Sequence, residues 1–331
     1  MRRRQIAAAL AAFVVPRAVV AQAVRRRRLA IMVTAASDAE VSENGIRFFR
    51  AFFAELRRLD YVEDRTLIVE RWSGHGVTAR YSELAREIVS SKPDVIFAVS
   101  TRLARALQAA TTSIPIVAFA GNMVGAGLAD SLSRPGHNVT GVSAVFGVEI
   151  QIKRLEMLRD AIPAATRIGF LVPRNAWDTG GAREVREAAP RLGMTLIGAL
   201  LDDPVQASEY RRVLALLPEQ RVDALYVFDA GENFVHRQLI VELAMASRLP
   251  TIGPWRELPE ADGLMSFGAD LGEAGRILAG YVARTLQGER PENLPIRLLD
   301  KFEVVVNLKT ARALNLTIPA AILVRADQVI E

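Results

Sequence analysis

The chain has 331 residues, 50% of them hydrophobic and 24% charged, so it is long enough to form two globular domains with sizeable cores. Its formal charge is +5, but four arginines and no acidic residue lie in residues 1–23, which leaves 38 basic and 37 acidic residues in the rest; this near balance excludes the basic footprint of a nucleic-acid-binding protein. The chain contains no cysteine, which excludes disulfides, cysteine nucleophiles, thiolate metal sites and a lipidated cysteine.

Residues 1–23 have the pattern of a signal peptide. Residues 2–4 are arginines and form a positive n-region, and residues 6–15 form an apolar h-region of ten residues, which is too short to span a bilayer. An Ala-Gln-Ala sequence follows as an A-x-A cleavage site, so we expect cleavage near Ala23 and a mature periplasmic chain that starts at Val24. The paired arginines leave both the general secretory route and the twin-arginine route open.

The first half of the chain alternates short apolar runs with segments of helical periodicity. Continuous apolarity predicts buried strands, and apolar residues spaced three and four apart predict helices. The predicted strands are residues 29–33, 67–70, 94–99 and 116–120, and the predicted helices are residues 45–59, 81–90 and 101–110. This alternation predicts a parallel, doubly wound sheet.

The same alternation restarts after residue 150. The predicted strands are residues 167–172, 195–201, 224–228 and 249–252, and the predicted helices are residues 151–161, 181–192, 208–217 and 234–247. We therefore predict two similar α/β lobes in tandem. They are joined through a strand-like segment at residues 139–145, because no Ser/Gly-rich linker separates them.

The C-terminal stretch must return to one or both lobes. It contains predicted strands at residues 263–268 and 301–307 and predicted helices at residues 271–287 and 308–314. We predict that lobe 1 comprises residues 24–142 and about 268–297, and that lobe 2 comprises residues 143–267 and about 298–331. The fold class is α/β, with two doubly wound parallel-sheet lobes and an interlobe cleft that closes by hinge rotation.

Signatures of enzyme chemistry are absent from the sequence. It contains no HExxH, no G-x-S-x-G, no P-loop and no G-x-G-x-x-G after the first predicted strand. The three histidines, His75, His137 and His236, lie far apart and have no metal-ligand spacing. The glycines of residues 121–127 resemble a phosphate-binding loop, but their spacing differs and a tight turn explains them. We therefore expect no catalysis, no metal ion and no cofactor.

Polar and small side chains follow the predicted strands of both halves. In open α/β sheets, ligands bind beyond the carboxyl ends of the strands. Hydroxyl, amide, guanidinium and indole groups suit reversible hydrogen bonding and stacking. Any one of these residues could instead be a cap or a turn residue, and Thr101 has the position of an N-cap. The candidate ligand-binding residues are Ala36, Ser37, Ser100, Thr101, Arg102, Gly121, Asn122, Arg174, Asn175, Asp229, Trp255 and Arg256.

Arg102 is the most informative of these candidates. It lies in the first turn of a predicted helix, where the helix dipole disfavours a cation. One interpretation is a solvated surface arginine, because exposed charges contribute little. The other is a clamp on a ligand carboxylate, which a bidentate guanidinium fits well. In that second interpretation, Asn122 and Arg174 join Arg102 in the cleft, and Trp255 supplies a stacking face.

Several segments resemble one known family. They include residues 111–115 (TTSIP), 131–141 (SLSRPGHNVTG), 153–158 (KRLEML), 263–268 (GLMSFG) and 301–313 (KFEVVVNLKTARA). Together they resemble the ABC transporter substrate-binding proteins related to the tryptophan- and tyrosine-binding importer components, over nearly the whole chain. The resemblance implies a periplasmic-binding-protein fold, a small-molecule ligand in the interlobe cleft, a membrane permease as partner, and no catalysis.

The chain departs from this family at the expected cleft. Where members often have Asp-Pro-Val after the fourth strand, it has Asn122-Met123-Val124, and arginines stand at positions 102 and 174 where members often have neutral residues. The loss of one anion and the gain of two cations favour a carboxylate-bearing ligand, aromatic or amino-acid-like.

Two other functions are compatible with the same fold. A ligand-sensing domain that signals to a membrane receptor would share the cleft, and an α/β enzyme would share the architecture. We expect a monomer that binds no nucleic acid.

Overall fold

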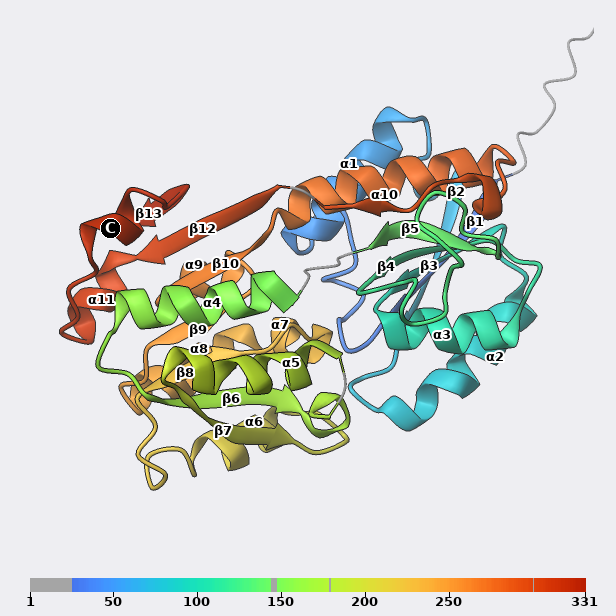
Figure 1. Cartoon of the computed structure of the whole chain (residues 1–331). Coiled ribbons are helices and arrows are strands. Elements are labelled where there is room, and N and C mark those ends of the chain that lie inside the picture. The colour runs from blue at the N-terminus through green and yellow to red at the C-terminus, as the bar shows by residue number, and fades with distance from the viewer. Residues whose placement is uncertain (1–25, 144–147, 179, 300) are drawn as a thin grey trace, which may run out of the picture.

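Two α/β lobes lie side by side in the computed structural model, which describes residues 26–143, 148–178, 180–299 and 301–331 (Figure 1). The predicted signal peptide lies outside the described residues. Among the described helices, none is both long and apolar enough to cross a membrane. The two lobes, their parallel sheets and the α/β class were all predicted from the sequence, and the structure confirms them.

Lobe 1 is built on a six-stranded sheet in the order β11-β5-β4-β3-β1-β2, and every neighbouring pair is parallel. Its inner strands are buried on both faces, which is typical of parallel sheets covered by helices, whereas its two edge strands are partly or fully exposed. The strands are β1 (Arg27–Val33), β2 (Leu67–Ser73), β3 (Val95–Val99), β4 (Ile116–Ala120), β5 (Val139–Ser143) and β11 (Arg297–Leu298).

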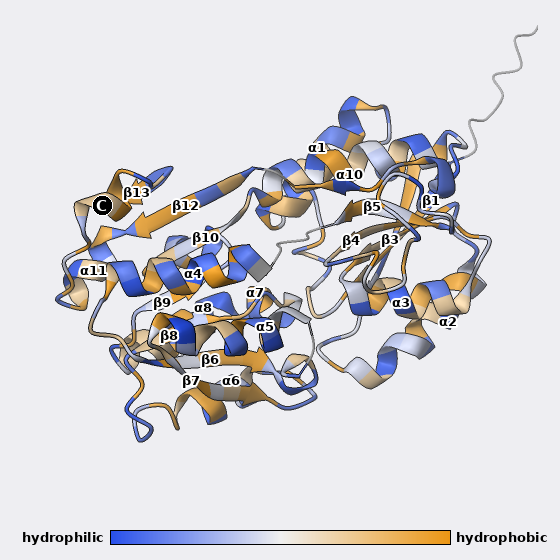
Figure 2. Cartoon of the chain, in the orientation of Figure 1, coloured by the Kyte–Doolittle hydropathy of each residue, from blue (hydrophilic) through white to orange (hydrophobic). Residues whose placement is uncertain are grey.

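Helices cover both faces of this sheet. Alternate residues of β1 point to opposite sides, so Leu29 and Ile31 belong to one buried cluster and Ala30 and Met32 to another. The first cluster includes α1 (Arg47–Arg58) and α10 (Leu271–Leu286), and the second includes α2 (Tyr81–Ser91) and α3 (Thr101–Ala110). Figure 2 shows the apolar residues gathered in the strands.

Lobe 2 is built on a seven-stranded sheet in the order β13-β12-β10-β9-β8-β6-β7. β12 runs antiparallel to β10, because the chain re-enters lobe 2 at the end where β10 leaves it, and β13 runs parallel to β12; the other neighbouring pairs of this sheet are parallel. The strands are β6 (Arg167–Pro173), β7 (Thr195–Leu201), β8 (Ala224–Val227), β9 (Thr251–Gly253), β10 (Met265–Ala269), β12 (Phe302–Asn307) and β13 (Gln328–Ile330).

The helices of lobe 2 differ from the predicted ones at two points. The helix predicted at residues 234–247 is two helices that meet at His236, whose backbone leaves the helical region. The helix predicted at residues 181–192 ends at Ala188, and a 3₁₀ turn containing Pro190 follows. The helices are α4 (Val148–Ala161), α5 (Gly180–Ala188), α6 (Ala207–Leu214), α7 (Gly231–Val235), α8 (Arg237–Ala246), α9 (Glu257–Glu260), α11 (Leu308–Ala313) and α12 (Ala320–Leu323).

The packing of α10 on α1 ties the C-terminal part of the chain to lobe 1. α10 follows β10 of lobe 2 but lies against α1, and a Cβ at Gly275 would lie 2.4 Å from the carbonyl oxygen of Phe48. The absence of a side chain at Gly275 therefore lets the two helices approach closely. Gly280, on the same helix, has nothing within 4 Å of its Cβ position.

These two glycines give opposite predictions for stability. Gly275→Ala should lower the melting temperature, because the overpacking cost of about 1–3 kcal/mol exceeds the gain in helix propensity. Gly280→Ala should raise it, because alanine is favoured over glycine in a helix by about 1 kcal/mol and meets no obstacle. Thermal melts of the two variants beside the wild type test this, and equal shifts would contradict the close approach at Gly275.

Candidate functional site

The loops at the carboxyl ends of the two sheets contact each other across the lobes. The loop after β2 lies against the loops after β6 and β7. The amide of Val205 donates to the carbonyl of Gly76 at 3.0 Å, and the amide of Thr78 donates to Oδ1 of Asp203 at 3.0 Å. Nδ2 of Asn175 donates to Oγ1 of Thr78 at 3.4 Å. The site at which the sheet rule places a ligand is therefore the boundary between the lobes.

An ion pair crosses this boundary. Nη2 of Arg102, on α3 of lobe 1, donates to Oε1 of Glu232, on α7 of lobe 2, at 2.5 Å. The Glu232 side chain is 1% exposed and that of Arg102 is 34% exposed. Nη1 of Arg102 lies 3.4 Å from Oγ1 of Thr78, and its guanidinium lies over the ring of Tyr81. These four residues, Thr78, Tyr81, Arg102 and Glu232, form what we call the cross-lobe cluster.

This cluster contradicts the first interpretation of Arg102. The residue is not a solvated surface charge, because it pairs with a buried carboxylate. The second interpretation, a clamp on a ligand carboxylate, stays a prediction, and in this structure Glu232 accepts from one of the guanidinium donors. Glu232 was not among the candidates, since it lies at the start of a one-turn helix, ahead of the helix predicted at residues 234–247.

Glu232 keeps an open acceptor. Its Oε1 accepts from Arg102 and from the hydroxyl of Tyr81 at 3.3 Å, whereas its buried Oε2 has no hydrogen-bond partner among the described residues. Burial raises the pKa of Tyr81, and the charge of Glu232 raises it further, so the hydroxyl keeps its proton and acts as donor. A buried carboxylate oxygen without a donor is costly, which favours a solute donor at this position.

The lobes approach closely beside Glu232. A Cβ at Gly231 would lie 2.4 Å from Oγ1 of Thr34, in the loop after β1. Glycine at position 231 therefore lets α7 of lobe 2 lie against lobe 1, which brings Glu232 within reach of Arg102.

A second group of polar side chains lies in lobe 2, between α4 and the strands β8 and β10. Arg154 is fully buried, its Nε donates to the carbonyl of Phe267 at 2.6 Å, and its Nη1 lies 3.4 Å from the hydroxyl of Tyr226. The Tyr226 hydroxyl donates to the carbonyl of Gln151 at 3.2 Å. Burial raises the pKa of Asp229, at the end of β8, and the charge of Arg154 partly offsets this rise.

Asp229 was a candidate from the sequence, but its neighbour Arg154 was missed. Helical spacing in the sequence could have identified Arg154 as a buried residue, because it lies on the same face of α4 as the buried Leu155 and Leu158. A charged residue on the apolar face of a helix requires a polar partner inside the fold.

Several candidates have local roles. Oγ of Ser100 accepts from the amide of Leu103 at 3.2 Å, so Ser100 caps α3, and the N-cap assignment to Thr101 is wrong. Oγ1 of Thr101 instead accepts from the amide of Gly121 at 2.9 Å and links the loops after β3 and β4. Oδ1 of Asn122 accepts from the amide of Gly125 at 2.8 Å and closes a turn.

The remaining candidates divide between surface and core. Arg174 pairs with Asp202 on the surface, and Ser37 bonds to Glu40. Trp255 is 5% exposed and packs edge-on against Phe234, so its indole lies in the core and offers no open stacking face. Ala36 is also buried, and Arg256 bonds to Glu260 and Glu303.

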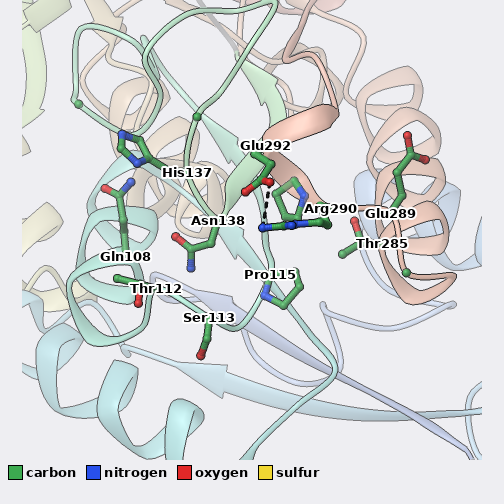
Figure 3. A pocket seen from close by; sticks show the side chains of 14 residues that line it. Gln108, Thr112, Ser113, Pro115, His137, Asn138, Thr285, Glu289, Arg290 and Glu292 are labelled. Carbon is green, nitrogen blue, oxygen red and sulfur yellow. Dashed lines mark ion pairs between the residues drawn. The ribbon is translucent and has the colours of Figure 1, made fainter.

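One cavity lies away from this boundary. It has a volume of about 760 Å³ and lies at the amino ends of β4 and β5, between the loop that carries His137 and the end of α10 (Figure 3). Arg290 and Glu292 on its wall pair at 2.9 Å. The described residues contain no group of acidic and histidine side chains that could hold a metal ion.

Comparison with known proteins gives a consistent result. A family model described as ABC transporter substrate binding protein matches residues 36–330. A tyrosine-binding protein of Clostridioides difficile (strain R20291) is 24% identical over 268 residues, which cover 81% of this chain and 76% of that protein.

Two solved structures show the same fold. A conserved domain protein from Vibrio cholerae has a TM-score of 0.79 at 24% identity, over 92% of this chain and 100% of that chain. An ABC domain from Streptococcus pneumonia in complex with L-Trp has a TM-score of 0.76 at 21% identity, over the same shares of the two chains.

The cross-lobe ion pair yields a prediction about lobe closure. Arg102→Ala should increase the radius of gyration in small-angle X-ray scattering without added solute, because removing a charged hydrogen bond costs about 1.5–3 kcal/mol and leaves Glu232 unpaired. Arg105→Ala, at an exposed position of the same helix, is the matched control and should scatter as the wild type does. An unchanged radius for Arg102→Ala would show that the pair does not hold the lobes together.

Proposed function

Because the chain belongs to the family of ABC transporter substrate-binding proteins, we propose that it is the solute-binding component of an importer, which takes up a small carboxylate-bearing molecule between its lobes and presents it to a membrane permease. The members of this family are substrate-binding proteins, so the expectation that the chain is not an enzyme is confirmed. The chain crosses between the lobes after β5, after β10 and between β11 and β12, which supports rotation of the lobes about these segments.

The observation that carries the proposal is the ion pair of Arg102 and Glu232. One lobe supplies a cation and the other supplies a buried carboxylate, at the carboxyl ends of the two sheets. A solute with a carboxylate and an ammonium group would replace both partners: its carboxylate would bind Arg102, and its ammonium group would bind Glu232, including the unpartnered Oε2.

This chemistry supports an amino-acid-like solute. A relative is named a tyrosine-binding protein, and one of the similar structures contains L-Trp. Aromatic amino acids are therefore the first solutes to test, together with analogues that lack one of the two charged groups.

Isothermal titration calorimetry separates the two recognition groups. Arg102→Ala should weaken binding of L-tryptophan about ten- to a hundredfold but should not weaken tryptamine, because tryptamine has no carboxylate. Glu232→Gln should weaken L-tryptophan similarly but should not weaken indole-3-propionate, because that molecule has no ammonium group. Arg105→Ala should bind as the wild type does. If Arg102→Ala binds every carboxylate as tightly as the wild type, the proposed role of the ion pair is wrong.

We also propose that the protein acts in the periplasm after removal of residues 1–23. This rests on the n-region, h-region and A-x-A site of the sequence. N-terminal sequencing of protein from the periplasmic fraction should show Val24 or a near neighbour as the first residue. An intact Met1 in the cytosolic fraction would rule out cleavage and export.

A further inference from the structure

Hydrogen bonds join the two lobes at the sheet edges that lie opposite the chain crossings. In lobe 1 the crossings leave from β5 and β11, and β2 is the edge strand on the other side of the sheet. In lobe 2 the crossings involve β10 and β12, and β7 is the edge strand on the other side. The loops that follow β2 and β7 bond to each other across the boundary, so this contact lies far from the crossings.

The loop after β2 is fixed to lobe 1 by its own backbone. The amide of Gly74 donates to the carbonyl of Val33 at 3.0 Å, and the amide of Gly76 donates to the carbonyl of Thr34 at 2.9 Å. The φ angle of Gly76 is +72°, in the left-handed region that favours glycine. In this conformation the carbonyl of Gly76 reaches lobe 2, where the amide of Val205 donates to it at 3.0 Å.

The loop after β7 meets this loop at two points. Val205 is 4% exposed, so packing fixes the amide that donates to Gly76. Oδ1 of Asp203 accepts from the amide of Thr78 at 3.0 Å. A Cβ at Gly76 would lie 2.5 Å from the carbonyl oxygen of Val205, so the two main chains are in direct contact. These four residues, Gly76, Thr78, Asp203 and Val205, form what we call the edge latch.

We propose that the edge latch holds the lobes together on the side opposite the crossings and limits the rate at which a bound solute leaves. When one lobe rotates about the crossings, the displacement of each atom grows with its distance from them, so opening separates the latch residues the most. Both bonds of the latch use main-chain amides and no long side chain, so little side-chain entropy is lost when they form. The limit on solute release rests on the proposed function, whereas the latch itself does not.

Two glycines of lobe 1 provide a matched pair of variants. Gly76 and Gly127 have nearly the same φ angle, +72° and +73°, so alanine is strained alike at both positions. Gly127 lies in the loop after β4 and has nothing within 4 Å of its Cβ position. Only Gly76→Ala therefore adds a clash between the lobes, and the difference between the two variants reports the close approach of the loops.

Distances between spin labels test the latch without a solute. The chain has no cysteine, so Ser82→Cys on α2 and Ser208→Cys on α6 provide the only labelling sites; both positions are exposed, and the two helices follow the two loops. Double electron–electron resonance on the mature protein should give the same short distance in the labelled wild type and in Gly127→Ala. In Gly76→Ala the mean distance should increase and the distribution should broaden, because the clash prevents the loops from meeting.

Release kinetics test the second half of the proposal. In stopped-flow measurements, L-tryptophan should dissociate from Gly76→Ala about ten times faster than from the wild type, because the closed state loses roughly the contribution of one hydrogen bond. Gly127→Ala should release it at the wild-type rate. If Gly76→Ala lengthens the spin-label distance but releases L-tryptophan at the wild-type rate, the latch does not limit release. If the wild type does not bind L-tryptophan, the solute proposed above is wrong, and the spin-label distances alone decide on the latch.

The latch is overturned if Gly76→Ala, shown by a thermal melt to be folded, gives the wild-type distance distribution. It is also overturned if Gly127→Ala lengthens the distance equally, because backbone strain would then be the cause. Asp203→Ala is the second variant in case Gly76→Ala does not fold. It removes only the bond to Thr78, at an exposed position, so it should lengthen the mean distance in the same direction, and an unchanged distribution in this folded variant would overturn the latch.

Discussion

The packing of α10 on α1 is the contact on which the rest of the structure depends. α10 follows a strand of lobe 2 but completes the helical layer of lobe 1, and Gly275 makes this possible by leaving room for the backbone of α1. Because of this contact, the chain has to cross to lobe 1 after β10 and return before β12. The crossings lie between the two sheets, and one buried apolar cluster includes residues of both lobes.

Charged residues form ion pairs at the point where the chain crosses from one lobe to the other. Asp270 caps α10 and accepts from Nη2 of Arg47 at 3.0 Å. Burial raises the pKa of Asp270, but the charge of Arg47, the amides of Glu273 and Gly272 and the charge of Lys301 together bring it below its ordinary value. Glu303, at the start of β12, pairs with Arg256 of lobe 2 at 2.8 Å and lies 3.7 Å from Arg47 of lobe 1. Arg47 of lobe 1 therefore lies within ion-pair distance of acidic residues on both sides of the crossing.

Local pattern was enough to predict the two lobes and most of their elements, but not the partners of the site residues. Continuous apolar runs in the sequence indicate the longer parallel strands. β11 and β13 are only two and three residues long and carry exposed side chains, so no apolar run indicates them. Arg102 was correctly placed after β3, yet its partner Glu232 is 130 residues away on a one-turn helix, and sequence spacing does not report such a contact. Trp255 follows β9 as expected, but Phe234 covers it.

The placement of α10 also governs the order in which the molecule can assemble. The pair of Arg47 and Asp270 joins residues 223 positions apart, and β11, at the edge of the first sheet, comes later still. A nascent chain that ends before α10 has four phenylalanines of α1 (Phe48, Phe49, Phe52 and Phe53) without their covering helix. The sheet of lobe 1 and the helical layer over α1 are therefore complete only after most of the chain has been synthesised, so lobe 1 finishes packing late although it contains the first strand.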